Sequence, residues 1–468
     1  MAPFKAQNMS NNSYVTSDGG EIGRAQAFQA AACGIEPTVE MNPVLLKPSS
    51  DTGSQVVVLG KAVKVMRTRE YHQYQREVVG VIQASLEKLL RQYDIIVIEG
   101  AGSPAELNLR PFDIVNMAVA RMASSPVILV GDINLGGVFA WLVGTLELLT
   151  IEERSLVKAF LINKFRGDIS LLDDGITFLE TKTGKKVLGV LPYVAGLQLA
   201  EEESVRESRW RSSRPSDSDK LDVAVIPFPR LSNSTDFDSL ESEPDVRLRY
   251  LAKPPEPGEP LLDLLILPGS KSTMADLAYL QSSGFAQYIH WCHAAHVPIV
   301  GICGGYQMLG KRLFDPQEVE STTSTAEGLG LLDQVTTFAA EKKTVQVRAL
   351  SPDFCQELAG YEIHMGRTQN ASHVRPMFHV IEEGGMPVSR LDGGRSENGL
   401  VWGTYIHGVF DAPGFRRQLL NTLRERRRLA PVRVETNSSN DDSLDFLAGM
   451  VREHLDLPLL QDLLDGAV

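Results

Sequence analysis

A strand-like apolar run that ends at a cysteine between glycines constrains this fold more than any other segment. Residues 297–300 read Val-Pro-Ile-Val, and residues 301–307 read Gly-Ile-Cys-Gly-Gly-Tyr-Gln. Glycines on both sides of the thiol permit a tight, strained turn and leave room for a reacting carbonyl. A buried strand that ends in such a turn is typical of α/β enzymes with an exposed nucleophile. We therefore predict an α/β fold with Cys303 as a catalytic nucleophile.

Length, charge and cysteine usage exclude several classes of protein. The 468 residues suffice for two or three domains, and a net charge of −13 argues against a general nucleic-acid binder. No apolar run reaches the ~18 residues that would span a membrane. The four cysteines are scattered without the spacing of metal ligands or of a disulfide framework. This pattern favours a cytoplasmic protein, where a thiolate nucleophile stays reduced.

The first half of the chain alternates strand-like and helix-like segments. We expect strands at residues 93–99, 126–132, 157–163 and 187–191, because these runs are apolar and rich in β-branched residues. Helical spacing of apolar residues predicts helices at 76–91, 112–124 and 138–149. Strands that alternate with helices predict a doubly wound parallel sheet with helices on both faces.

A change of composition divides the chain into two α/β domains. Residues 201–220 are rich in Glu, Ser, Arg and Asp, which is typical of a linker. We predict a first domain at 1–200, a linker at 201–220, a second domain at 221–425 and a C-terminal tail at 426–468. The tail begins with a second polar segment, at 431–443, and continues as a short helical stretch.

Two further segments of the second domain favour acyl transfer. Residues 264–270 form a strand-like run that ends in Pro-Gly-Ser, a tight turn able to offer backbone N–H groups to an oxyanion. His407 closes another apolar run, at 402–408. An imidazole beside the sulfur would hold Cys303 as thiolate and return a proton to a leaving group.

The pattern Gly-x-Cys-x-Gly-x-Gln resembles the nucleophile turn of class I glutamine amidotransferases, which release ammonia from glutamine through a cysteinyl thioester. The resemblance implies oxyanion donors at Gly269 and Gly304 and places Gln307 beside the glutamine pocket. Most members carry His-Pro-Glu, whereas this chain has Gly-Val after His407. The third member of the triad is thus absent from its usual place, as in the corrinoid-amidating subgroup.

Five segments closely resemble the cobyric acid synthase family in collinear order over residues 1–415. They lie at residues 4–10, 16–26, 41–48, 99–104 and 360–366. The resemblance implies a dethiobiotin-synthetase-like first domain that uses ATP and Mg²⁺. It also implies amidation of the b, d, e and g carboxylates of adenosylcobyrinic acid a,c-diamide, with glutamine as nitrogen donor. Glutamine and a corrinoid are thus the expected partners, and a homo-oligomer is considered.

The resemblance assigns roles to several residues of the first domain. Glu99 follows a predicted strand, where doubly wound sheets bind ligands, and resembles a metal-binding acid. Lys5 could steady phosphate or a substrate carboxylate. Asp18 and Glu21 are candidates for a second Mg²⁺ contact or for the acceptor, with turn chemistry as the alternative. Asn163 could contact adenine.

One departure from the family pattern bears on ATP binding. The Gly-rich phosphate loop that ends in Gly-Lys-Ser/Thr is found nowhere in this sequence. A sheet without the family's first strand would expose strand edges. A misplaced start codon and a degenerate relative without synthetase activity both remain open. The other functional alternatives are a cobyrinic acid a,c-diamide synthase, a cell-wall amidotransferase, and a non-catalytic corrinoid-binding protein.

Overall fold

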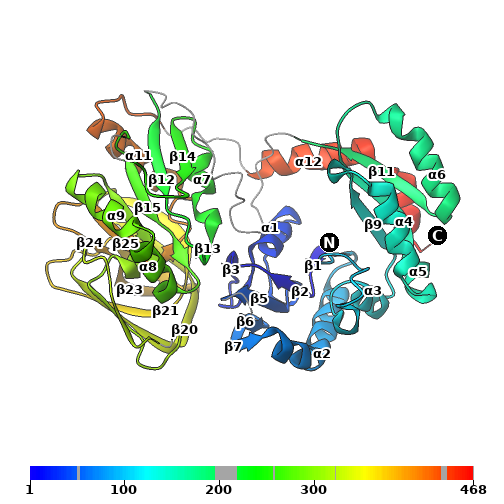
Figure 1. The fold of residues 1–468 in the computed structure, drawn as a ribbon, viewed down its shortest axis with the longest axis horizontal. Helices are drawn as coiled ribbons and strands as arrows, with labels where there is room; N and C mark the ends of the chain where they lie inside the picture. The colour runs from blue at the N-terminus through cyan, green and yellow to red at the C-terminus, as the bar shows by residue number, and fades with distance from the viewer. Residues whose placement is uncertain (50–52, 195–218, 257–258, 322, 434–439, 467–468) are drawn as a thin grey trace.

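The computed structural model describes residues 1–49, 53–194, 219–256, 259–321, 323–433 and 440–466. Figure 1 shows the second domain on one side, strands β1–β7 in the middle and the β9–β11 region on the other side. Most of the predicted linker, residues 201–218, lies outside the described residues. Among those that are described, no helix is both long and apolar enough to cross a membrane.

The first domain is built from several small sheets. Strands β1 (Ala2–Phe4) and β8 (Ile96–Ile98) pair in parallel. A four-stranded sheet has the order β2-β5-β6-β7, and β3 pairs with β4 as a hairpin. Their bounds are β2 Gln7–Met9, β3 Ser13–Val15, β4 Glu21–Gly23, β5 Val44–Pro48, β6 Gly53–Val58 and β7 Lys61–Arg67.

The expected parallel strands form two separate pieces. Strands β9 (Val127–Asp132), β10 (Val157–Phe165) and β11 (Lys186–Pro192) make a parallel sheet of their own in the order β11-β10-β9. In the described part of the chain, β8 pairs with β1 and β9 with β10, so no ladder joins the two pieces. Val97 of β8 and Val130 of β9 are each 54% exposed, as expected of open strand edges.

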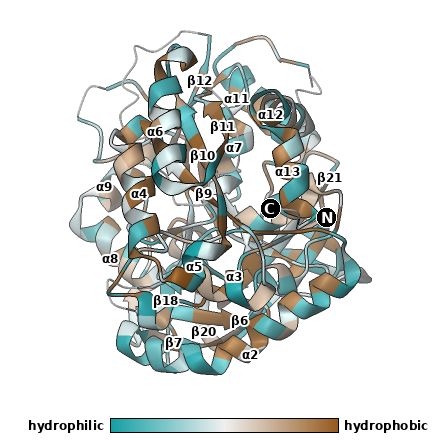
Figure 2. Cartoon of the chain, turned by 90° about the vertical axis from the view of Figure 1, so that its right-hand side faces the viewer, coloured by the Kyte–Doolittle hydropathy of each residue, from teal (hydrophilic) through white to brown (hydrophobic). Residues whose placement is uncertain are grey.

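Amphipathic helices cover these sheets. Helix α2 (Thr68–Gln92) buries Val78, Ile82 and Leu86 at helical spacing, and Figure 2 shows apolar and polar segments alternating along it. The other helices of the domain are α1 Arg24–Ala32, α3 Met117–Ala123, α4 Val138–Leu148, α5 Ile151–Leu156 and α6 Asp173–Thr183.

The predicted helix at 112–124 starts later than expected. Helix α3 begins only at Met117, because the Asp113 carboxylate accepts hydrogen bonds from the backbone N–H groups of Val115, Asn116 and Ala118 at 2.8–3.0 Å. An aspartate that binds backbone N–H groups in this way stabilises a turn before the helix.

The C-terminal tail returns to the first domain. Helices α12 (Asn440–His454) and α13 (Leu457–Leu464) lie beside β11. The backbone N–H of Asp456 donates to Leu188 O at 2.8 Å, and Leu463 is buried against Ala159 and Leu188. The tail predicted as a separate segment therefore completes the cover of the β9–β11 sheet.

The second domain contains a six-stranded sheet in the order β14-β12-β15-β17-β25-β24, in which only β24 is antiparallel. The strands are β12 Leu221–Val225, β14 Val246–Tyr250, β15 Leu264–Leu267, β17 Ile299–Ile302, β24 Gly394–Arg395 and β25 Val401–Thr404. The helices are α7 Asp238–Glu241, α8 Thr273–Ser282, α9 Phe285–Ala294, α10 Gly304–Met308 and α11 Pro413–Arg426.

A mostly antiparallel sheet flanks the parallel one. It runs β19-β18-β20-β21-β26, and β22 and β23 extend it from β20. Its strands are β18 Arg312–Phe314, β19 Thr325–Glu327, β20 Gln334–Ser351, β21 Gln356–Asn370, β22 Phe378–Glu383, β23 Met386–Asp392 and β26 Ile406–His407. A small pair joins β13 (Leu231–Ser232) to β16 (Gly269–Ser270). The carboxyl ends of β15, β17 and β25 lead into the three segments singled out in the sequence.

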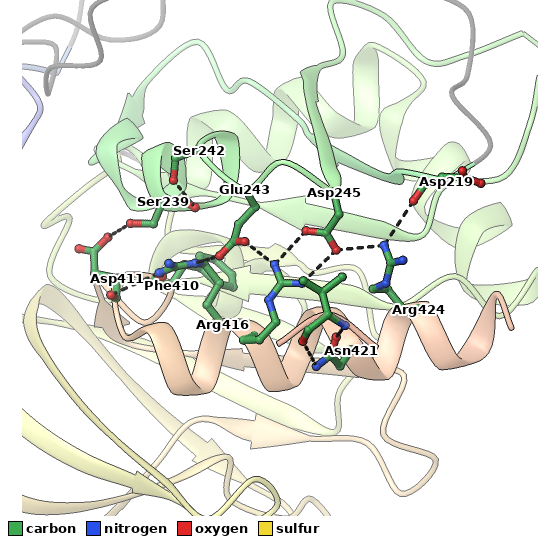
Figure 3. Close-up of polar contacts among 12 residues, drawn as sticks. Asp219, Ser239, Ser242, Glu243, Asp245, Phe410, Asp411, Arg416, Asn421 and Arg424 are labelled. Atoms are coloured by element: carbon green, nitrogen blue, oxygen red, sulfur yellow. Dashed lines mark hydrogen bonds and ion pairs between the residues drawn. The ribbon is translucent and has the colours of Figure 1, made fainter. Parts of the chain in front are cut away.

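Arginine side chains of α11 form ion pairs with Glu243 and Asp245, which lie just before β14 (Figure 3). Arg417 binds both oxygens of Asp245 at 2.9 Å, and Arg424 binds Asp245 Oδ2 at 3.0 Å. Arg416 donates to Glu243 at 2.6 Å. Burial alone would raise the pKa of Asp245, but the two guanidinium groups outweigh it and hold the pKa below its usual value. The network therefore stabilises the ionised carboxylate.

We expect Asp245→Asn to lower the free energy of unfolding by about 3 kcal/mol, because the buried guanidinium of Arg424 loses its carboxylate partner and that of Arg417 keeps only Glu243. Since the folded pKa of Asp245 is lowered, the wild-type advantage is present above about pH 4 and shrinks as the pH falls further. Urea unfolding followed by circular dichroism at several pH values measures both effects. Glu341→Gln is the control, since the Glu341–Arg367 pair is largely exposed and should contribute little.

Candidate active site

Cys303 sits on a strained turn between β17 and α10. Its φ of 49° and ψ of −104° lie outside the regions that ordinary side chains favour. The neighbouring glycines are needed because the backbones crowd together: a methyl group on Gly305 would lie 2.1 Å from Leu267 O, and one on Gly301 would lie 2.7 Å from Gly305 C. The local geometry is therefore that of a nucleophile turn at the end of a strand.

His407 lies beside Cys303 and is oriented by an aspartate. Its Nδ1 is 2.7 Å from Asp236 Oδ2, and the backbone N–H of Gly408 donates to Asp236 Oδ1 at 3.0 Å. Asp236 belongs to a 3₁₀ helix, Ser234–Phe237, between β13 and α7. The sulfur of Cys303 lies close enough to the ring to raise the pKa of His407, and it contacts Ile363 O at 3.6 Å. The structure thus brings a thiol, an imidazole and a carboxylate together, and their catalytic roles stay predictions.

Burial alone would lower the pKa of His407, but the Asp236 carboxylate and the Cys303 sulfur outweigh it and raise the pKa to about 10. The imidazole is therefore protonated at neutral pH. A protonated imidazole beside a cysteine stabilises the thiolate, which is the reactive form. Tyr361 stacks on the ring at a centroid distance of 5.3 Å and fixes its plane.

The predicted oxyanion residues lie around this pair. A methyl group on Gly269 would come within 3.1 Å of His407 Cε1, and one on Gly304 within 2.9 Å of the backbone N of Ser270. The two glycine turns therefore meet beside the sulfur, as a shared oxyanion site requires. Gln307 is 2% exposed and is held between Thr273 Oγ1 and Tyr405 OH at 3.1 and 3.3 Å. The oxyanion and glutamine roles stay predictions.

A cavity of about 310 Å³ adjoins the sulfur and is lined by both domains. The second domain contributes Cys303 and Gln307, and the first domain contributes Lys47 and Gln55. Its volume suits an amino-acid-sized ligand. The cavity is also highly charged, because it is lined by Lys47, Lys271, Lys342 and Glu320.

Two of these charged groups, Lys271 and Glu320, have no oppositely charged partner in a salt bridge among the described residues. Lys271 Nζ donates to the neutral Gln55 Oε1 at 3.0 Å, and Glu320 accepts from the backbone N–H and the hydroxyl of Thr273 at 2.9 and 3.4 Å. Burial and the ammonium groups of Lys342 and Lys47 lower the pKa of Lys271, while burial raises the pKa of Glu320. Both side chains would therefore gain from a bound molecule that carries one positive and one negative charge.

Glu21 joins the domains instead of facing solvent. It is 1% exposed; Oε1 accepts from Lys47 Nζ at 2.6 Å and from Ser13 Oγ at 2.9 Å, and Oε2 pairs with Lys342. Burial would raise the pKa of Glu21, but the two lysines outweigh it and hold the pKa far below its usual value. With both oxygens taken by ammonium groups, the carboxylate is better suited to fastening the domains than to the Mg²⁺ or acceptor contact that we predicted.

The domain contact also reaches the histidine. Asn233 lies with Nδ2 3.3 Å from either ring nitrogen of His407, and its Oδ1 accepts from the backbone N–H of Ser13 at 2.9 Å. Ser234 N donates to Asn12 Oδ1 at 2.9 Å. The first domain therefore contacts His407 through a single intervening side chain.

Lys5 and Glu99 lie together at the carboxyl ends of β1 and β8. Lys5 Nζ donates to Glu99 Oε1 at 3.0 Å, and Gln29 Nε2 donates to Glu99 Oε2 at 2.8 Å. Glu99 keeps 37% of its side chain exposed, whereas Lys5 is buried. The two residues share one site, at the sheet edge where the sequence predicted ligand binding.

Asp18 and Asn163, the remaining candidates of the first domain, lie apart from Lys5 and Glu99. Asp18 is in the β3–β4 turn, where its Oδ1 accepts from Thr16 Oγ1 and Gly20 N, which is the turn chemistry considered as its alternative. Asn163 lies at the end of β10 in the separate β9–β11 sheet and accepts from the N–H of Lys164 at 2.8 Å. Its contact with a nucleotide stays a prediction.

The sequence did not point to Asp236, Lys271 or Glu320. Asp236 lies 171 residues before the histidine that it orients, in a polar run with no pattern of its own. Lys271 does follow the predicted oxyanion turn directly, which is the one local signal that could have drawn attention to it.

Comparisons with known proteins agree with the division of the chain into two domains. A model of the CobB/CobQ-like glutamine amidotransferase domain matches residues 222–415, and a model of the CobQ/CobB/MinD/ParA nucleotide binding domain matches residues 1–206. Cobyric acid synthase of Pelotomaculum thermopropionicum is 50% identical over 99% of this chain and 90% of the relative. The chain belongs to the cobyric acid synthase family.

Other members of the family align over a similar extent. Cobyric acid synthase of Limosilactobacillus reuteri is 47% identical over 100% of this chain and 93% of the relative. Among solved structures, PurLQS from Thermotoga maritima is similar at 19% identity, with a TM-score of 0.33, over 44% of this chain and 99% of that one. Within the family, the Cys303 site belongs to the amidotransferase domain and the Lys5–Glu99 site to the nucleotide-binding domain.

Proposed function

We propose that this protein is a glutamine-hydrolysing amide ligase that converts adenosylcobyrinic acid a,c-diamide into adenosylcobyric acid, by amidation of the b, d, e and g carboxylates. The observation that carries the proposal is the Cys303–His407–Asp236 arrangement beside an amino-acid-sized cavity. The family membership supports the choice of acceptor. A cytoplasmic location is part of the proposal, because all four cysteines are free thiols.

The cysteine site would release ammonia in two steps. The Cys303 thiolate attacks the side-chain carbonyl carbon of glutamine, and the N–H groups at Gly269 and Gly304 hold the oxyanion. His407 gives its proton to the departing ammonia, which leaves a thioester on the cysteine. Water then attacks the thioester, His407 takes a proton from it, and glutamate leaves. Gln307, held by Thr273 and Tyr405, shapes the pocket.

Lys271 and Glu320 would orient the substrate from its other end. Free glutamine carries an α-carboxylate and an α-ammonium group, which complement these two incompletely paired side chains. Gln55 and Lys47 of the first domain close the same cavity. Glutamine binding would therefore engage both domains.

We expect Lys271→Met to raise the KM for glutamine by about 10- to 100-fold, because one charge-assisted hydrogen bond is lost. The kcat should change little, since Lys271 touches no reacting atom. Lys311→Met is the matched control, because Lys311 pairs with Asp333 on the surface away from the cavity. A fall in kcat without a rise in KM would contradict the assignment. Steady-state glutamate release measures both constants.

The Lys5–Glu99 site would serve carboxylate activation. A single carboxylate beside a lysine fits Mg²⁺, which takes one or two protein carboxylates and fills its remaining positions with phosphate oxygens and water. Bound ATP and Mg²⁺ would supply the phosphoryl group that makes a carboxylate reactive. Glu99 would hold the metal, Lys5 would hold a phosphate or the acceptor carboxylate, and Asn163 would contact the base.

A two-part experiment tests the proposal. Incubation with a diazoketone analogue of glutamine should label Cys303, as located by peptide mass spectrometry, and glutamine should protect it. Incubation with adenosylcobyrinic acid a,c-diamide, ATP, Mg²⁺ and glutamine should then give successive amide products by mass spectrometry. If the diamide stays unchanged and cobyrinic acid, offered in a parallel incubation, is amidated at its a and c carboxylates, the acceptor is wrong. If Cys303 stays unlabelled, the glutaminase assignment fails.

A further inference from the structure

Asn233 is a buried polar residue to which the proposed reaction gives no role. It is 2% exposed and directly precedes the 3₁₀ helix Ser234–Phe237, which carries Asp236. Its φ of 54° and ψ of 48° lie in the left-handed region, which few residues other than glycine adopt and which asparagine tolerates. Such a conformation persists where surrounding contacts hold it, and it is common beside active sites. The contacts of Asn233 therefore decide what it can do.

Three hydrogen bonds from the first domain fix the side-chain amide of Asn233. The backbone N–H of Ser13 donates to Asn233 Oδ1 at 2.9 Å, and the backbone N–H of Asn233 donates to Asn11 O at 3.4 Å. The backbone N–H of Ser234 donates to Asn12 Oδ1 at 2.9 Å. A backbone N–H can only donate, so the amide must present its oxygen to Ser13, because the reversed amide would set two donors against each other. The NH₂ group is therefore the part of the amide that faces away from Ser13.

This NH₂ group faces the ring of His407. Asn233 Nδ2 lies 3.3 Å from both ring nitrogens, while Nδ1 lies 2.7 Å from the Asp236 carboxylate. A carboxylate only accepts, so Nδ1 keeps its hydrogen. The ring also contacts the Cys303 sulfur and stacks on Tyr361. Nε2 is thus the nitrogen that can lose its proton, and the Asn233 NH₂ group can donate to it only when that proton is gone.

We propose that Asn233 is a positioning residue for thioester hydrolysis: its NH₂ group, held in place by the first domain, stabilises the unprotonated His407 that accepts a proton from water. The inference rests on the proposed function, in which Cys303 and His407 form and then hydrolyse the thioester. Before the thiolate attacks, the imidazole needs its proton, and the Asp236 carboxylate and the Cys303 sulfur both favour the protonated ring. In the thioester the sulfur carries no charge, so one of these two influences is removed, and the Asn233 donor then favours the base.

Two substitutions change the NH₂ group without disturbing the backbone. Asn233→Asp keeps the size of the side chain and an oxygen for the N–H of Ser13, but it turns a negative charge toward the ring and favours the imidazolium. Thioester formation should stay within about threefold of the wild type, whereas its hydrolysis should slow at least about tenfold. Asn233→Gly removes the donor, and glycine adopts a positive φ freely, so hydrolysis should slow by about three- to tenfold. The γ-glutamyl thioester should therefore accumulate in both variants, and more in Asn233→Asp.

Rapid-quench kinetics of the full chain with glutamine test the inference. Ammonia release reports formation of the thioester, glutamate release reports its hydrolysis, and intact-protein mass spectrometry measures the fraction of enzyme that carries it. Hydroxylamine attacks a thioester without the help of a base, so it should restore most of the turnover of Asn233→Asp, which a packing defect would not allow. Asn398→Asp is the matched control, because it adds the same charge at an exposed asparagine of the same domain, and it should behave like the wild type.

Slow ammonia release by Asn233→Asp without accumulated thioester, or wild-type kinetics in both Asn233 variants, would overturn the inference. Should Asn233→Asp fail to fold, the smaller accumulation expected of Asn233→Gly decides the question in the same way. In each of these cases the wild type still hydrolyses glutamine, so the proposed function stands. A wild type that releases no ammonia from glutamine and forms no thioester on Cys303 would instead overturn the proposed function, and the inference with it.

Discussion

Replacing Cys303 with alanine is expected to lower glutamine hydrolysis by about 10⁴-fold or more, because no other group can form the thioester. Amidation driven by added ammonium salt should persist, since the Lys5–Glu99 site lies in the other domain and needs only free ammonia. Glutamate release measures the first activity, and mass spectrometry of the corrinoid product measures the second. The decisive readout is whether Cys303→Ala still amidates the corrinoid with ammonium salt while it no longer does so with glutamine.

Cys355→Ala is the matched control, because Cys355 is an exposed thiol of the same domain, and its sulfur contacts the nearby Pro352 O. It should hydrolyse glutamine like the wild type. Retained hydrolysis in Cys303→Ala would remove the nucleophile from the mechanism. Loss of both nitrogen sources in a folded Cys303→Ala protein would instead show that the two sites do not divide the work as proposed.

The features that the sequence predicted well depend on residues that lie close together along the chain. The turn at Cys303 could be predicted because crowded backbones require glycine within a few residues of the thiol, and that requirement is visible in the sequence. His407 comes just after the apolar strand β25, which pairs with β17, the strand that ends at the Cys303 turn. Its position could therefore be predicted from the strand that precedes it. The strands and helices of the second domain's parallel sheet followed from the same periodicity.

The features that were missed depend on contacts between distant parts of the chain. Asp236 contacts His407 from the 3₁₀ helix between β13 and α7, 171 residues earlier in the chain. The ion pairs of Glu21 with Lys47 and Lys342 are complete only when the two domains meet. Packing of α12 and α13 on β11 joins the end of the chain to its first half. Polar side chains show no periodicity that reveals such partners, so a single sequence cannot predict which charges will pair.

The domain contact explains why these buried charges lie where they do. Glu21, Lys47 and Lys342 are removed from water, and such charges are tolerated only when they are paired. Lys47 of the first domain and Lys342 of the second line the cavity at Cys303, and Asn233 links Ser13 to His407. A shift of the first domain would therefore alter the cavity beside Cys303 and the imidazole of His407 together.

Replacing Asp236 with asparagine is expected to lower kcat/KM for glutamine hydrolysis by about 10²- to 10⁴-fold. The carboxylate holds the ring of His407 at 2.7 Å and, with the Cys303 sulfur, keeps the imidazole protonated. An asparagine keeps the size of the side chain but removes the negative charge, and its NH₂ group can donate to Nδ1 and favour the wrong tautomer. Both the thiolate and the acid that protonates ammonia would then be lost.

The pH dependence gives this prediction a signature that a packing defect would not produce. In the wild type, the pKa of His407 near 10 keeps the imidazolium present across the neutral range. Without the Asp236 charge, burial should lower this pKa, so the residual activity of Asp236→Asn should fall as the pH rises through the neutral range. Asp411→Asn is the matched control, since Asp411 lies four residues after the histidine, and its carboxylate contacts Ser239 and Arg24. A pH profile in Asp236→Asn that matches the wild type would mean that the aspartate only packs against the ring.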